Sequence, residues 1–142
     1  MRSLLDVNML LALFDKEHSD HGKAQAWWDQ DRNQPWATCP FTQNSFLRII
    51  SQTRYGRPKL LAVAFRILNQ WTSEPEHEFW HDDLSLNDSA IIDHYRILSP
   101  RHLTDIYLLA LAVKHGGRLV TLDRGVPLAA VRGAGAERLV VV

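Results

Sequence analysis

The stretch LTDIYLLALAVKHGGRLVTLDRG, residues 103–125, combines a helix, a helix end and a buried strand in one run. Residues 103–115 are apolar at most positions and lead into Gly116-Gly117, a pair that is typical of a helix C-terminus. The short apolar run RLVTL, residues 118–122, then predicts a buried strand. A helix that leads directly into a buried strand is typical of the units from which parallel α/β sheets are built.

The same alternation of short apolar strands and helices continues through the rest of the chain. We predict strands at residues 3–5, 36–39, 77–81, 118–122 and 139–142. We predict helices at residues 8–14, 19–31, 42–53, 60–71, 89–98 and 103–115. Ser19 is the expected N-cap and Asp20 the expected first-turn acid of one of these helices. Thr42 is the expected N-cap of another, and Pro58 is the expected first residue of a third. The pattern indicates an α/β fold whose parallel sheet is covered by helices on both faces.

The composition is that of one globular domain over residues 1–142, with 46% hydrophobic and 23% charged residues. The formal net charge is zero, so the chain as a whole has no field that favours nucleic acid or an anionic membrane. Cys39 is the only cysteine, which excludes an internal disulfide and a four-cysteine zinc site and favours the cytoplasm. No apolar run approaches the ~20 residues of a membrane span, and we expect neither a signal peptide nor membrane contact.

The charges are distributed unevenly along the chain. Residues 32–73 contain no acid and six basic residues, which are Arg32, Arg48, Arg54, Arg57, Lys59 and Arg66. Residues 74–93 reverse this pattern, with seven acidic residues and no Lys or Arg. Two explanations fit this charge pattern equally well. One is a set of exposed helix faces that differ in the sign of their charge, and the other is a basic segment that faces a polyanion.

Three aspartates occupy positions that belong to one edge of the predicted sheet. Asp6 and Asp123 each directly follow a predicted strand, and Asp105 lies in the first turn of the predicted helix 103–115. Ligands bind at the carboxyl ends of the strands in open parallel sheets, so we expect the three side chains at one rim. Each aspartate alone has a simpler explanation, because an acid at such a position commonly caps a helix or complements its dipole.

Taken together, the three carboxylates favour a metal site. Carboxylates that are crowded together repel one another, and a hard divalent cation between them relieves the repulsion. Mg²⁺ prefers oxygen ligands and keeps several waters, so it suits a site with few carboxylates. A bound Mg²⁺ or Mn²⁺ lowers the pKa of its water and polarises a phosphoryl oxygen, as phosphodiester hydrolysis requires.

Four pieces of the sequence, in order, resemble the PIN-domain family and, within it, the VapC-type toxins of toxin–antitoxin pairs. They are LLDVNMLLALF, WATCPFTQNSFLRI, LTDIYLLALAVKHGGRLVTLDRG and the short strand that closes the sequence. The resemblance implies a three-layer α/β/α sandwich with a central parallel sheet of four to five short strands. It also implies a Mg²⁺- or Mn²⁺-dependent endoribonuclease, a small antitoxin that neutralises it, and a homodimer.

The same resemblance implies roles for individual residues. Asp6, Asp105 and Asp123 are the expected catalytic acids, Asp6 and Asp105 among them are the expected metal ligands, and Asn8 and Thr121 are the expected polar support. We expect the metal to activate a water that attacks the RNA phosphodiester in line.

One position departs from the family pattern. The family usually has a Glu at the start of the middle helix, in a TEN-like context, and this chain has Gln43 within Thr42-Gln43-Asn44. Gln retains an oxygen ligand but carries no charge, so it binds Mg²⁺ less well and cannot act as a base. We expect Gln43 to support the site of an enzyme that works with three aspartates and one metal. The alternative is a PIN-like module that binds RNA or a protein without cutting. A phosphohydrolase with Asp6 as covalent nucleophile is a weaker alternative, because the second Asp expected two residues later is Asn8.

Arginines are the expected RNA contacts, since contacts to phosphate supply most of the sequence-independent affinity for nucleic acid. We predict three RNA-binding residues in the basic segment, Arg48, Arg54 and Arg57. We predict a fourth in Arg124, which directly follows Asp123 at the expected rim.

Overall fold

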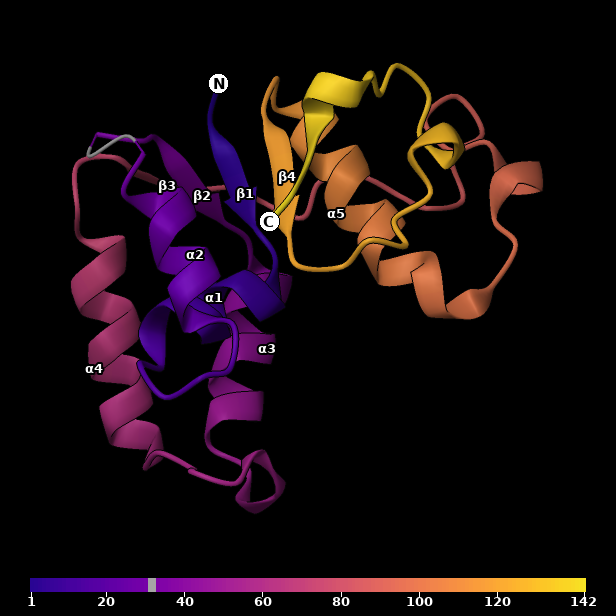
Figure 1. The fold of residues 1–142 in the computed structure, drawn as a ribbon. Helices are drawn as coiled ribbons and strands as arrows, with labels where there is room; N and C mark the ends of the chain where they lie inside the picture. The colour runs from indigo at the N-terminus through magenta and orange to yellow at the C-terminus, as the bar shows by residue number, and fades with distance from the viewer. Residues whose placement is uncertain (31–32) are drawn as a thin grey trace.

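A five-stranded sheet forms the centre of the computed structural model, which describes residues 1–30 and 33–142 (Figure 1). Its strands are β1 (Ser3–Leu5), β2 (Trp36–Thr38), β3 (His77–Phe79), β4 (Arg118–Thr121) and β5 (Leu139–Val141). They lie in the order β3-β2-β1-β4-β5, and every neighbouring pair is parallel. The predicted parallel sheet is confirmed, and each strand falls within its predicted range. Because all strands are parallel, their carboxyl ends meet at one edge of the sheet.

Helices cover both faces of this sheet, as predicted. One face carries α1 (Val7–Phe14), α2 (His21–Trp28), α3 (Pro40–Ile50) and α4 (Leu61–Thr72), and the other carries α5 (Leu103–Lys114) (Figure 1). Successive strand residues point into two different hydrophobic cores. Leu4 packs into the core beneath α5, whereas Leu5 packs into the core beneath α1 to α4. The fold is therefore a three-layer α/β/α sandwich, and none of the helices among the described residues is long and apolar enough to cross a membrane.

The structure differs from the predicted roles of Thr42 and Pro58 at the starts of two helices. The first, α3, begins at Pro40 with Cys39 as its N-cap, so the predicted cap Thr42 lies inside the first turn. The Thr42 hydroxyl accepts a hydrogen bond from the backbone N–H of Cys39 at 3.0 Å. Pro40 favours the earlier start because its fixed φ suits the first helical position, where its missing N–H has no partner to lose. The second, α4, begins at Leu61, so Pro58 precedes the helix and is not its first residue.

The helix predicted at residues 19–31 forms as α2. It begins at His21, so Asp20 is its N-cap in place of the predicted Ser19, and the Asp20 side chain makes no capping hydrogen bond. The helix ends at Trp28, and the predicted end near residue 31 lies outside the described residues.

The prediction of a helix at residues 89–98 is wrong. Ile92 instead pairs with Val131 in an isolated antiparallel bridge, and the backbone N–H of Asp93 donates to the carbonyl of Ala130 at 2.9 Å. Because a distant segment takes these backbone groups, they are not available for helical hydrogen bonds, and only a short 3-10 turn follows.

A buried carboxylate ties the end of α1 to the loop between α3 and α4. Asp15 is 5% exposed, and its Oδ2 accepts hydrogen bonds from the Tyr55 hydroxyl at 2.6 Å and from Nη2 of Arg57 at 3.3 Å. Arg57 also pairs with Glu17 at 2.8 Å. Burial raises the pKa of Asp15, but the hydrogen bonds from Tyr55, the Glu17 N–H and Arg57 outweigh it and hold that pKa below its usual value.

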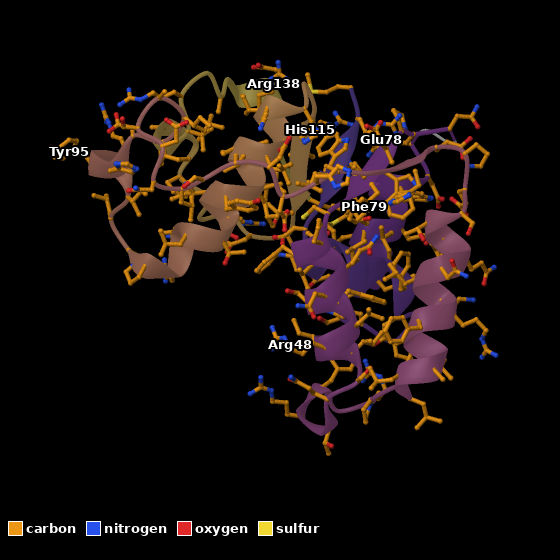
Figure 2. All side chains as sticks on the ribbon, turned by 180° about the vertical axis from the view of Figure 1, so that it is seen from behind. Arg48, Glu78, Phe79, Tyr95, His115 and Arg138 are labelled. Carbon is orange, nitrogen blue, oxygen red and sulfur yellow. The ribbon has the colours of Figure 1, made fainter. Side chains whose placement is uncertain are left out.

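Tyr55→Phe is expected to lower the free energy of unfolding by about 1–2 kcal/mol, because it removes a donor from a buried carboxylate. Urea unfolding followed by circular dichroism measures this change. Tyr95→Phe is the control, because Tyr95 is 95% exposed and projects from the outer edge of the molecule (Figure 2). An equal effect of the two substitutions would contradict the role given to the Tyr55 hydroxyl.

Candidate active site

Asp6 lies at the carboxyl edge of the sheet, between the end of β1 and the start of α1. Its backbone N–H donates to the carbonyl of Val120 in β4 at 3.0 Å. Its side chain is buried: Oδ1 accepts from the N–H of Val7 at 2.6 Å, as the N-cap of α1, and Oδ2 accepts from the Thr121 hydroxyl at 2.7 Å. Asp6 is thus a helix cap and also a buried acid, and each carboxylate oxygen retains a lone pair for a further partner.

The Thr121 hydroxyl, at the end of β4, connects several of the predicted site residues. It donates to Asp6 and accepts from Nδ2 of Asn8 at 3.0 Å and from the backbone N–H of Asp123 at 3.1 Å. A hydroxyl offers one donor and two acceptor positions, so its hydrogen bonding is complete. Asn8 also accepts from the N–H of Leu122 at 3.1 Å, which joins the first turn of α1 to the end of β4. The structure therefore brings Asp6, Asn8, Thr121 and Asp123 together.

Asp105 reaches the same edge from the first turn of α5. Burial, followed by the charges of Asp6 and Asp123, raises the pKa of Asp105 to about 6, although His102 opposes the rise. His102 Nδ1 lies 3.8 Å from Oδ2 of Asp105. Because both other carboxylates affect the pKa of Asp105, the three aspartates lie within electrostatic reach of one another.

The other two acids differ in their exposure. Burial raises the pKa of Asp6, the charge of Asp123 raises it further, and the hydrogen bonds from Thr121 and Val7 lower it without reversing the shift. Asp123 is exposed, and its Oδ1 accepts from the N–H of Gly125 at 2.7 Å. The three carboxylates repel one another, and a divalent cation that binds between them relieves this repulsion.

The spacing of the acids limits how they can hold a metal. Within the described residues, no three His, Cys, Asp or Glu side chains converge closely enough to hold one ion directly. The donor set therefore fits a cation held by two carboxylates, with a third that acts through water, which is how proteins usually bind Mg²⁺. The prediction of Asp6 and Asp105 as the direct ligands is compatible with this arrangement, because both are less exposed than Asp123.

The side-chain amide of Gln43 donates its hydrogen bond to a residue outside the predicted site. Its Nε2 donates to the hydroxyl of Thr38, at the end of β2, at 2.8 Å, and that hydroxyl lies 2.8 Å from Nε2 of His77 in β3. Gln43 also lines a cavity of about 180 Å³ together with Leu68 and Thr72 of α4. These contacts hold the Gln43 amide at the carboxyl end of β2, which borders β1 on the side away from β4.

The predicted RNA-binding arginines differ in their surroundings. Arg48 and Arg124 are exposed and, within the part of the chain that the structure describes, have no hydrogen-bond or ion-pair partner. Figure 2 shows Arg48 projecting from α3 into solvent. Arg54 is also exposed and donates one hydrogen bond to a side-chain amide at 2.7 Å. Arg57 belongs to the carboxylate cluster at the end of α1, so its charge is already offset, and Arg32 lies outside the described residues.

The sequence analysis missed two neighbours of the aspartates, Arg101 and His102. Together with Asp123 they line a cavity of about 240 Å³. His102 precedes Asp105 by three residues, a spacing that brings side chains together at a helix start and that offered a sequence signal. Arg101 had no comparable signal, because only the fold brings it to the same cavity as Asp123.

Known proteins with similar sequences cover nearly the whole chain. A model of the PIN domain matches residues 3–133. Ribonuclease VapC44 of Mycobacterium tuberculosis is 50% identical over 139 residues, which span 98% of this chain and 98% of that protein. Ribonuclease VapC39 of the same species is 40% identical over 124 residues, which span 87% of this chain and 89% of that protein.

Two solved structures share the fold. VapC20 of M. tuberculosis, described as a sarcin–ricin loop cleaving toxin, matches 91% of this chain and 95% of its own with a TM-score of 0.62 at 15% identity. VapBC2 of Rickettsia felis, solved with a DNA fragment from its promoter, matches 100% of this chain and 98% of its own with a TM-score of 0.55 at 12% identity. At such low identity these two structures show the likeness of the fold alone.

Proposed function

Because the chain belongs to the PIN domain family, as a VapC-type member, we propose that it is a metal-dependent endoribonuclease and the toxin of a type II toxin–antitoxin system. The family membership confirms the resemblance that the sequence motifs indicated. The observation that carries the proposal is the meeting of Asp6, Asp105 and Asp123 at one edge of the sheet, where their charges repel. In the proposed reaction, water adds to the phosphorus of an RNA phosphodiester and the bond to the leaving oxygen breaks.

The residues of the site have separate proposed roles. Asp6 and Asp105 are the direct ligands of Mg²⁺ or Mn²⁺, and Asp123 acts through water. When bound, the cation polarises a phosphoryl oxygen and lowers the pKa of its water. Thr121 donates to Asp6 and is itself held by Asn8, so the two residues fix the orientation of the Asp6 carboxylate before the cation arrives.

We propose RNA contacts for the predicted arginines that pair with no carboxylate among the described residues. Arg48 and Arg124 are exposed and lack a carboxylate partner among the described residues, and Arg54 donates only to an amide. Each of them can therefore contact a phosphate without first breaking an ion pair. Arg57 is the weakest of the four candidates, because Asp15 and Glu17 already offset its charge.

A cognate small antitoxin is the proposed protein partner. The VapC names of the relatives support this partner, as does a VapBC assembly among the structures that share the fold. We also propose a homodimer and a cytoplasmic location, and both rest on family membership.

The test is cleavage of a mixed RNA substrate with added Mg²⁺ or Mn²⁺, beside the same reaction in EDTA. Cleavage that requires the cation is the expected result. The alternative is a module that binds RNA or a protein without cutting, and the neutral Gln43 is the feature that favours it. Tight RNA binding without cleavage, on a broad panel of RNAs and with either cation, would replace the proposed function by this alternative.

Gln43→Glu is expected to leave the cleavage rate nearly unchanged and to lower the free energy of unfolding by about 1 kcal/mol. The reason is that the Gln43 amide donates to Thr38, and a carboxylate cannot make that donation. Asn44→Asp, which adds the same charge at an exposed position of α3, is the control for charge alone. Cleavage by Gln43→Glu but not by the unaltered protein would mean that three aspartates do not suffice.

A further inference from the structure

The cavity lined by Arg101, His102 and Asp123 has no role in the function proposed so far. Its volume is about 240 Å³. Asp123 belongs both to this cavity and to the aspartate site, so the cavity adjoins the place at which the proposed reaction occurs.

The Arg101 side chain is oriented but electrostatically unpaired. Its Nε donates to Nε2 of His102 at 3.3 Å. Its two terminal amino groups have no partner among the residues that the structure describes. Arg57, Arg96 and Arg132, by contrast, each pair with a carboxylate. A guanidinium whose terminal amino groups are free is suited to bind a phosphate through two hydrogen bonds.

The negative charge of the aspartate site favours a fixed positive side chain nearby. Three ionised aspartates carry three negative charges, and one divalent cation offsets two of them. The phosphates on either side of the scissile one therefore approach a site that is still negative, which weakens RNA binding unless fixed cations lie nearby. Arg101 supplies a positive charge before α5, and Arg124 supplies another directly after Asp123.

We propose that Arg101, oriented by His102, binds the RNA phosphate that neighbours the scissile phosphodiester, in the cavity shared with Asp123. This inference rests on the proposed ribonuclease function and extends it to one substrate contact. Because the contact is made to the backbone, it contributes affinity and position but no base preference.

The test measures RNA binding separately from cleavage. The affinity of a labelled single-stranded RNA is determined by fluorescence anisotropy over a range of salt concentrations, with Asp6→Asn in every protein so that the strand stays intact. Arg101→Gln is expected to weaken binding about tenfold at low salt, as the loss of one charge-assisted contact does. It is also expected to reduce the slope of log affinity against log salt by about 0.7, the value for one phosphate contact on a single strand.

Two further variants sharpen the experiment. Arg101→Lys keeps the charge but not the planar fork, so its affinity is expected to lie between those of the parent protein and Arg101→Gln. Arg96→Gln removes the same charge from an arginine that already pairs with Asp93, so its affinity should match that of the parent protein.

The outcomes separate this inference from the function on which it rests. Binding that is unchanged in affinity and salt slope by Arg101→Gln would overturn the inference and leave the ribonuclease function intact. No RNA binding by any of the proteins would count against both. Poly-glutamate that binds as tightly as RNA, with the same loss on Arg101→Gln, would assign the cavity to an acidic polypeptide and overturn the inference.

Discussion

Asp105→Asn is expected to slow RNA cleavage strongly and to stabilise the folded protein, so one substitution impairs activity and raises stability. Burial and the charges of Asp6 and Asp123 raise the pKa of Asp105 to about 6, so its ionised form is held against repulsion. Nδ1 of His102 lies 3.8 Å from Oδ2, which is too far for a hydrogen bond that Asn would lose. Cleavage should fall by about a hundredfold or more, because a ligand of the catalytic cation is lost. The free energy of unfolding near neutral pH should rise by on the order of 1 kcal/mol.

Asp6→Asn tests whether the two effects separate. It should slow cleavage to the same extent but bring no gain in stability, because Asn has one acceptor oxygen for the two donors, Val7 and Thr121, that Asp6 now serves. Cleavage rates and thermal unfolding at one pH measure both effects. Asp29→Asn, an exposed acid after α2, is the control and should change neither. An Asp105→Asn protein that is more stable yet still cleaves RNA would refute the proposed role of Asp105.

Mn²⁺ is expected to raise the melting temperature near neutral pH and to have little effect near pH 5. Folding raises the pKa of Asp105 from 3.8 to about 6, so the fold favours the protonated carboxyl. Without metal, the free energy of unfolding therefore falls as the pH rises from about 4 to about 6 and stays at the lower value above that range. A cation offsets this loss of stability only at pH values at which the aspartates are ionised. The stabilisation by the cation therefore depends on pH.

The size of the Mn²⁺ effect follows from the binding equilibrium. A free concentration of about ten times the dissociation constant corresponds to about 1.4 kcal/mol, or roughly 4 °C for a domain of this length. Melting curves at several pH values, with and without Mn²⁺, measure it. Asp105→Asn should flatten both the pH dependence and the response to Mn²⁺, whereas Asp29→Asn should behave as the unaltered protein does. A melting temperature that ignores Mn²⁺ and Mg²⁺ at every pH would contradict the metal site.

Local patterns in the sequence were enough to predict the class of the fold and the position of its acids. The apolar runs at residues 3–5 and 118–122 are short and are followed by acids, and the helix at 103–115 ends at a pair of glycines. Such signals depend on neighbours in the chain, and parallel strands carry whatever follows them to one edge of the sheet. For this reason, Asp6, Asp105 and Asp123 were expected together before any contact between them was known.

Contacts between distant segments decided what the local patterns did not encode. Residues 89–98 have a sequence that permits a helix, but their backbone pairs with the segment around Val131. The sequence indicated Arg57 and not Arg101 as an RNA contact, yet Asp15 pairs with Arg57 and no carboxylate among the described residues pairs with Arg101. The direction of the Gln43 amide is likewise set by Thr38 at the end of another element. The physical reason is that hydrogen bonds and ion pairs between elements depend on their packing, which only the tertiary structure fixes.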